Sequence, residues 1–276
     1  MAMEINDADL RVTVLGPLHL RIGGVEHSPG AFKPRQVLAL LLLNSNRMVP
    51  ISEFMHELWD QEPPRSALTT LQTYILHLRK FLAGALGIPQ SVVGRTLLVT
   101  MRGGYLFRLK PSQLDLDVFT QLTARGRQAM AAGEAALAAK LFRGALETWQ
   151  GHALVDVPAG PVIEPRVRGL QEARLVTHEQ CIESELLAGH HREVLSELAA
   201  LVAEHRYNET LHGHFMLALH RSGRRSEALG AYQRLRTTLI DEVGLEPSSE
   251  LRKLHQAMLS DVDSAPAGFG KLTLAG

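Results

Sequence analysis

The segment from Leu68 to Leu82 constrains the fold most, because its periodicity fits one kind of secondary structure. Apolar residues recur there at spacings of three and four: Leu68, Leu71, Ile75, Leu78 and Leu82. This spacing predicts an amphipathic helix whose apolar stripe packs against two preceding helices. At 100° per residue the opposite face is mostly small and polar, and it contains no acid. That face consists of Thr69, Thr73, Leu76, His77 and Lys80.

A long stretch around this helix lacks negative charge. From Pro63 to Lys110 the chain contains seven basic residues and no Asp or Glu. The whole chain has a formal net charge of zero, but residues 1–111 carry 12 Lys plus Arg against 8 Asp plus Glu, and the remainder carries 17 against 21. A phosphate backbone interacts with the local field, so this asymmetry favours a nucleic-acid partner. The alternative is a basic face that is merely solvated.

The flanking patterns predict a winged helix-turn-helix. Alternating apolar residues over 10–28, with Gly23-Gly24 between them, predict a small antiparallel sheet. Helices are predicted from Pro34 to Leu42 and from Ser52 to Trp59, before a connection at Gln61–Pro64 that contains two prolines. After the third helix, alternation over 97–109 predicts a hairpin whose tip is basic. In such a fold the third helix enters the major groove and the wing reaches the DNA backbone or minor groove.

The remainder predicts an all-α domain of TPR-like repeats. We expect residues 111–117 to be a linker and residues 118 to about 258 to be helical. Gly133, Gly189 and Gly223 are each followed by a similar pattern of small and apolar residues. The last two glycines are 34 residues apart, which is the tetratricopeptide period, whereas the first two are 56 apart. An unrelated helical bundle is the alternative.

These patterns define a fold that is mainly α with small β elements. The N-terminal winged helix-turn-helix is expected over residues 1–111, the all-α TPR-like domain over 112–260, and a disordered tail over 261–276, which is rich in small residues, Gly and Pro.

The sequence contains no constellation typical of an enzyme. Cys181 is the single cysteine and is expected to be a packed thiol. No nucleophile–base pair, cofactor loop or phosphate-binding G-x-x-x-x-G-K-[ST] element occurs. Several residues suggest a metal site but lack ligand spacing: Asp156, Glu164, His178, His190, His191, His212 and His214. We therefore expect no catalysis, no cofactor and no metal.

The longest apolar run, from Val37 to Leu43, is far too short to cross a bilayer. The N-terminus also lacks the pattern of a secretory leader. We expect a cytoplasmic, nucleoid-associated protein without a membrane partner.

Many short stretches resemble the small Streptomyces antibiotic regulatory proteins (SARPs) over nearly the whole length. In the N-terminal part they include Leu15-Gly16-Pro17-Leu18, Leu71-Gln72-Thr73-Tyr74-Ile75, Leu78-Arg79-Lys80 and Gly104-Tyr105-Leu106. In the C-terminal part they include Leu217-Ala218-Leu219-His220-Arg221-Ser222-Gly223-Arg224 and Gly244-Leu245-Glu246-Pro247-Ser248. The resemblance implies an OmpR-type DNA-binding domain followed by a bacterial transcriptional activator domain.

Such a protein would activate transcription by binding direct repeats upstream of promoters in gene clusters for antibiotics and other secondary metabolites. Its expected partners are double-stranded promoter DNA and the RNA polymerase holoenzyme, including the sigma factor and core subunits, and it would form a homodimer on DNA.

The resemblance also assigns roles to individual residues. Thr69, Thr73 and His77 fall where the fold presents base-reading side chains. The positions that hold phosphates are those of Thr70, Tyr74, Arg79 and Lys80, and Arg102 falls in the wing. Relatives commonly have arginine at position 77, and neutral histidine cannot form arginine's bidentate contact with guanine, so the preferred DNA sequence is expected to differ.

Three of these roles have alternatives. Tyr74 could pack against the flank of the helix, Arg79 could form a surface salt bridge, and His77 could be simply solvated.

OmpR-type proteins present the loop before the third helix to polymerase, which makes Trp59, Asp60, Glu62 and Arg65 candidates for polymerase contact. The prolines of that loop could instead serve only to position the third helix.

Two other function classes remain open. A repressor would use the same DNA-binding surface at a different place in the promoter. A TPR-like scaffold with a degenerate winged helix would bind peptide in place of DNA, although the acid-free third helix and wing argue against it.

Overall fold

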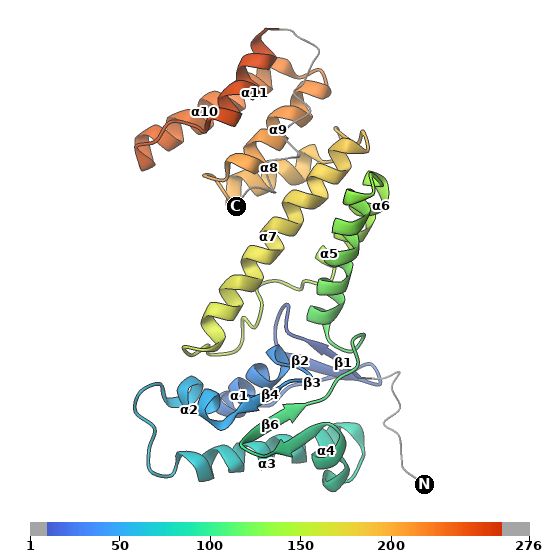
Figure 1. Ribbon diagram of the computed structural model, residues 1–276, viewed down its shortest axis with the longest axis vertical. Coiled ribbons are helices and arrows are strands. Elements are labelled where there is room, and N and C mark those ends of the chain that lie inside the picture. Colours follow the sequence, from blue (N-terminus) through green and yellow to red (C-terminus); the bar gives the residue numbers. More distant parts are fainter. Residues whose placement is uncertain (1–9, 261–276) are drawn as a thin grey trace. The chain divides into compact units, whose positions relative to one another are not determined.

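The computed structural model describes residues 10–260, which divide into two compact units (Figure 1). The first unit contains the described residues up to Thr123 together with Gly144–Leu175. The second contains Ala124–Arg143 and the described residues from Val176 onward. Three helices have residues in both units: α5 (Asp115–Ala131), α6 (Ala135–Leu146) and α7 (Ile163–Leu187). The tail expected to be disordered, residues 261–276, lies outside the described residues.

The first unit begins with the predicted small antiparallel sheet. Its strands β1 (Leu10–Thr13), β2 (His19–Ile22) and β3 (Val25–His27) are arranged in sequence order. Gly23 and Gly24 form the tight turn with φ of 55° and 85°, in the left-handed region that favours glycine.

Three helices and a second sheet follow, as a winged helix-turn-helix requires. The helices are α1 (Phe32–Leu43), α2 (Ile51–Trp59) and α3 (Ala67–Leu86). The predicted hairpin consists of β5 (Leu98–Met101) and β6 (Gly104–Phe107). Two short elements were not predicted from the sequence: β4 (Met48–Pro50), which pairs with β6, and α4 (Gln90–Thr96).

The apolar stripe of α3 differs from the prediction at its first residue. Leu71, Ile75, Leu78 and Leu82 are buried as expected, whereas Leu68 is 46% exposed. Ala67 takes its place and is buried. The prediction was wrong because spacings of three and four both fit a helix, so periodicity alone does not decide whether position 67 or position 68 precedes Leu71 on the buried side.

Residues 111–117 are not a free linker. The Val12 N–H donates to the Gln113 carbonyl at 2.7 Å, and α5 already begins at Asp115. The Asp115 carboxylate accepts hydrogen bonds from the backbone N–H groups of Val14 and Leu15 at 2.8–3.0 Å. Burial raises the pKa of this carboxyl group to about 6, although the backbone donors oppose the increase. The segment therefore packs against β1.

The chain between α6 and α7 also packs on the first unit. The Leu154 N–H donates to the carbonyls of Val14 and Gly16. The Asp156 carboxylate accepts from the Leu18 N–H at 2.7 Å and from the Arg35 guanidinium at 2.9 Å. This segment contributes several buried residues to the same core as α1 and α3: Trp149, Ala153, Leu154 and Val157.

The second unit is helical and contains the three glycines that begin the predicted repeats. It includes α8 (Leu195–Glu204), α9 (Glu209–Arg221), α10 (Arg225–Val243) and α11 (Ser249–Leu259). Gly133, Gly189 and Gly223 have φ of 78°, 90° and 79° and each lies in the turn after a helix. The residues that follow them at matching spacing are all buried: Ala138, Phe142, Ala145, Val194, Leu198, Leu201, Ala228, Tyr232 and Leu235. Cys181 is buried, as expected of a packed thiol.

Candidate nucleic-acid interface

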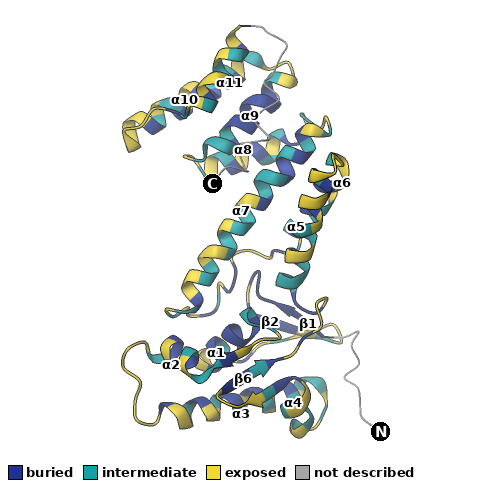
Figure 2. Ribbon diagram, in the orientation of Figure 1, coloured by how far each residue is buried: buried dark blue, intermediate teal, exposed yellow. Residues whose placement is uncertain are grey.

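The side of α3 opposite its apolar stripe faces solvent in this structure (Figure 2). The predicted base-reading residues Thr69, Thr73 and His77 are all exposed, as is Lys80. The Thr73 hydroxyl donates to the Thr69 carbonyl at 3.0 Å, a local bond that leaves the oxygen free to accept. The helix therefore presents small polar groups and one cation, with no carboxylate on the same face.

Of the predicted phosphate-binding residues, Lys80 lies on this face and the others lie along its flanks. Thr70 and Tyr74 are partly buried, and Tyr74 packs against the hydrophobic core. Packing and a phosphate contact are compatible for Tyr74, because a tyrosine can bury its ring and leave its hydroxyl in water.

Arg79 connects α3 to the hairpin. Its Nε and Nη2 donate to the Leu98 carbonyl at 3.0 and 2.8 Å, and Nη2 also donates to the Thr100 hydroxyl at 2.8 Å. Burial lowers the pKa of Arg79, and the nearby Tyr105 partly offsets this decrease. Burial also raises the pKa of Tyr105. This guanidinium therefore fixes the wing hairpin relative to α3, a role that the sequence did not predict.

Glycines shape the tip of the wing, where Arg102 is exposed. Gly103 has a φ of 84° and its carbonyl accepts from the Ile51 N–H at 3.0 Å. At Gly104 a Cβ would lie 2.2 Å from the Val49 carbonyl oxygen, so no larger residue fits. The hairpin is thus held against α2 while Arg102 remains accessible.

Leu76 is a further candidate that the site prediction left out. It is 43% exposed and lies on the same face of α3 as Thr73 and His77. An exposed leucine among the predicted base-reading positions is suited to contact a thymine methyl group. The sequence could have identified Leu76 as a candidate, because it lies opposite the apolar stripe and a leucine there has no core to pack against.

The loop before α3 presents the candidate polymerase-contact residues. Asp60, Glu62 and Arg65 are exposed, whereas Trp59 is half-buried and packs against the core. Asp60 has a φ of 52°, which ends α2 abruptly and directs the chain into the loop. The Ala67 N–H donates to the Pro64 carbonyl, so this proline also participates in starting α3.

Three of the residues that suggested a metal site have other partners in the structure. Asp156 binds Leu18 and Arg35, and His190 pairs with Glu185 at 2.7 Å. In the second unit His178 lies 3.5 Å from Glu197. That contact and Arg143 lower the pKa of Glu197 to about 2, against the effect of burial. Within residues 10–260 no group of three potential ligands is close enough to hold a metal ion.

Matches to known families cover most of the chain. Residues 114–259 match the family described as bacterial transcriptional activator domain, and residues 30–107 match the C-terminal domain of transcriptional regulatory proteins.

Individual relatives match nearly the whole chain. The regulatory protein DnrI of Streptomyces peucetius is 45% identical over 91% of this chain and 92% of its own length. AfsR of Streptomyces griseus is 38% identical over 91% of this chain but only 24% of its own length. A solved structure of Mycobacterium tuberculosis EmbR, in complex with a low-affinity phosphopeptide, superimposes with a TM-score of 0.84 at 35% identity. That match covers 91% of this chain and 65% of the EmbR chain.

The fold and the exposed face of α3 thus define a DNA-binding transcriptional regulator with a winged helix-turn-helix. The chain belongs to the SARP family, with an OmpR-type DNA-binding domain and a bacterial transcriptional activator domain. No helix within residues 10–260 is long and apolar enough to cross a membrane.

Proposed function

We propose that this protein activates transcription from promoters of secondary-metabolite genes, including those for antibiotics, by binding direct repeats and recruiting RNA polymerase. The observation that carries the proposal is the exposed face of α3, which contains Thr73, Leu76, His77 and the cation of Lys80. The sequence has no acidic residue between positions 63 and 110. A face of this composition suits the floor of the major groove, where carboxylates would be repelled by phosphates.

Phosphate contacts supply most of the affinity, and base contacts supply the selectivity. Thr70, Tyr74, Arg79 and Lys80 would hold phosphates along the flanks of α3. Within the described residues Nη1 of Arg79 has no hydrogen-bond partner, so it can donate to a phosphate while Nε and Nη2 hold the wing. Arg102 would reach the backbone or minor groove from the wing.

Thr69, Thr73 and His77 would read base edges, and Leu76 a thymine methyl group. A neutral histidine has one donor and one acceptor, which gives a weaker preference for guanine than arginine's two parallel donors.

Two molecules would bind adjacent direct repeats as a homodimer on DNA, with DNA binding assigned to residues 1–111 and activation to residues 112–260. The exposed residues of the loop before α3, Asp60, Glu62 and Arg65, would contact polymerase together with Trp59, which contributes its accessible edge. Asp60 and Glu62 would pair with a basic polymerase surface. The protein would act in the cytoplasm, on the nucleoid.

Transcription in vitro tests the direction of regulation. The full chain, its candidate promoter and purified polymerase holoenzyme are combined, and transcript is measured against protein concentration, alongside the affinity for the same DNA at several salt concentrations. More transcript with bound protein supports activation. Less transcript with the same binding would identify a repressor, and negligible affinity even at low salt would favour a peptide-binding scaffold.

A further inference from the structure

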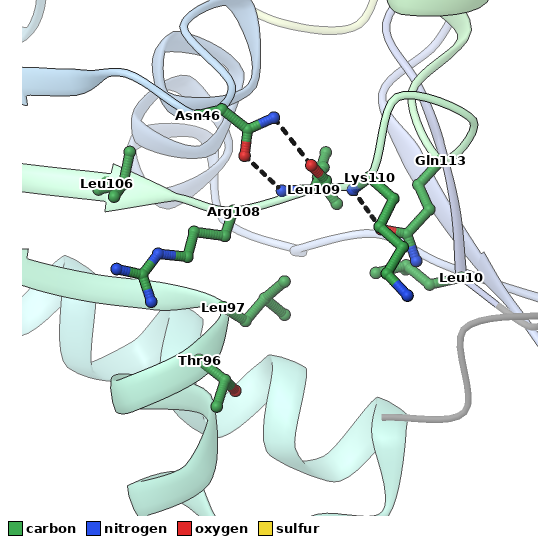
Figure 3. A pocket seen from close by; sticks show the side chains of 9 residues that line it. All are labelled: Leu10, Asn46, Thr96, Leu97, Leu106, Arg108, Leu109, Lys110 and Gln113. Carbon is green, nitrogen blue, oxygen red and sulfur yellow. Dashed lines mark hydrogen bonds between the residues drawn. The ribbon is translucent and has the colours of Figure 1, made fainter. Parts of the chain in front are cut away.

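A pocket of about 380 Å³ lies in the first unit, where the turn after α1, the end of α4 and the segment after β6 come together (Figure 3). Its lining includes Leu10 from β1, Thr96 from α4 and nearby residues of the chain. This volume lies near the lower end of the range for small-molecule sites, and it accommodates one or two fused rings.

The walls of the pocket are fixed by hydrogen bonds. The Asn46 side chain donates to the Leu109 carbonyl at 2.8 Å and accepts from the Leu109 N–H at 3.0 Å. The Gln113 side chain accepts from the Lys110 N–H at 2.8 Å. The Arg108 N–H donates to the Leu97 carbonyl at 2.8 Å. Because these bonds lock both flanking segments, the hollow is formed before any ligand arrives.

The lining combines an apolar surface with two cations. Four leucines, at positions 10, 97, 106 and 109, supply the apolar part. Figure 3 shows Arg108 and Lys110 on either side of Leu97. Among residues 10–260 no acidic residue lines the pocket, and the exposed Arg108 guanidinium forms no ion pair with any residue in this range. The Arg108 charge beside apolar walls complements an anion with an apolar body.

The pocket is separate from the proposed DNA-binding surface. Arg108 directly follows β6, whereas the wing tip with Arg102 and Gly103 precedes it. The base-reading residues of α3 do not line the pocket. A small ligand could therefore occupy this pocket whether or not DNA is bound.

We propose that this pocket binds a small organic carboxylate with an aromatic or alicyclic body. The leucines contact the ring system, and Arg108 holds the carboxylate with Lys110 adding positive charge nearby. Because Leu106 belongs to β6 and Leu97 directly precedes β5, such a ligand lies against β6 at the base of the wing hairpin.

Methyl NMR on the full chain tests this proposal, with 1-naphthoate as the probe and its neutral analogue 1-naphthamide for comparison. We expect saturable shifts centred on the methyl groups of the four pocket leucines. Both the neutral analogue and the Arg108→Gln variant should bind at least tenfold more weakly. The matched control is Arg95→Gln, which removes an exposed arginine of α4 that does not line the pocket, and it should bind naphthoate like the wild type.

Several outcomes would overturn the proposal. No shift at millimolar naphthoate, or shifts spread over many methyl groups, would exclude this site. Equal affinities of the Arg108→Gln and Arg95→Gln variants would exclude the arginine. Binding that appears only after removal of residues 2–9 would mean that the chain's own N-terminal segment, with Glu4, Asp7 and Asp9, fills the pocket.

Discussion

The Glu57 carboxylate, in α2, accepts a hydrogen bond from the N–H of Ile163, the first residue of α7, at 2.9 Å. The N–H groups of Gly160 and Val162 donate to the same carboxylate at 2.7 and 2.9 Å, and the Gln36 side chain donates to it at 2.7 Å. Backbone N–H groups at a helix start lack partners within the helix and carry partial positive charge. A buried anion is therefore satisfied here by four donors, within the core of the first unit.

Replacing Glu57 by Gln should lower the free energy of unfolding by about 2–4 kcal/mol. The change removes the negative charge and turns an NH2 group towards N–H donors, which leaves buried groups unsatisfied. Urea denaturation monitored by circular dichroism measures the loss. The matched control Glu62→Gln, at an exposed position, should change stability by less than about 0.5 kcal/mol. Equal stability of the two variants would contradict the role of Glu57.

Replacing Arg79 by Lys should weaken binding to all DNA sequences by a similar factor, on the order of tenfold. Lysine cannot reproduce the planar set of donors that holds Leu98 and Thr100, so the wing loses its fixed position relative to α3. Fluorescence anisotropy on specific and random duplexes measures the effect, and Arg95→Lys, on the exposed side of α4, serves as the control. A change confined to the specific duplex would mean that Arg79 reads sequence.

Replacing His77 by Arg should change the order in which DNA sites are preferred. Arginine donates two parallel hydrogen bonds to guanine, so sites with guanine opposite this position should gain about 1–3 kcal/mol relative to the others. Selection from a randomised DNA library gives the ranking for both proteins. If the ranking stays the same, His77 does not face the bases. The slope of log affinity against log salt concentration for non-specific DNA should steepen by no more than the amount expected for one phosphate contact.

Acid should destabilise the protein partly through His214. This residue of α9 is buried, and burial lowers its pKa to about 4, below the value near 6.5 expected in the unfolded chain. The unfolded state then binds more protons between these values, so stability is complete above pH 6.5 and is lost as the pH falls towards 4. The loss from this residue is on the order of 3 kcal/mol.

His214→Gln should flatten that part of the pH dependence, because glutamine does not titrate. The comparison is His152→Gln, at an exposed position, which should leave the slope unchanged. Urea midpoints between pH 4 and 7 provide the measurement. The same slope in both variants would show that other groups cause the acid sensitivity.

Local patterns were sufficient to predict α1, α2 and α3, the hairpin and the exposed face of α3. The stripe of Leu71, Ile75, Leu78 and Leu82 identifies the buried side of the helix, and its complement contains Thr73 and His77. Glycines at 133, 189 and 223 marked the helix turns, because each requires a positive φ. These features depend on residues close together in sequence, which periodicity can detect.

Contacts between distant segments were not predictable in the same way. Glu57 and Gly160 are 103 residues apart, and Asp115 reaches Val14 over 101 residues. Residues 111–117 therefore look like a linker in sequence although they pack against β1. The short strand β4 has three residues and depends on its pairing with β6. Local periodicity contains no signal for such partners.

The most direct test of DNA binding through α3 is the affinity of the full chain for its promoter repeat when an acid is placed on the exposed face. Thr73→Glu introduces a carboxylate among the proposed base-reading residues, whereas Thr237→Glu makes the same change on the exposed surface of α10. We expect the first variant to lose at least a hundredfold in affinity at 100 mM salt while folding normally, and the second to bind like the wild type. Equal affinities of the two variants would contradict the assignment of α3 as the recognition helix.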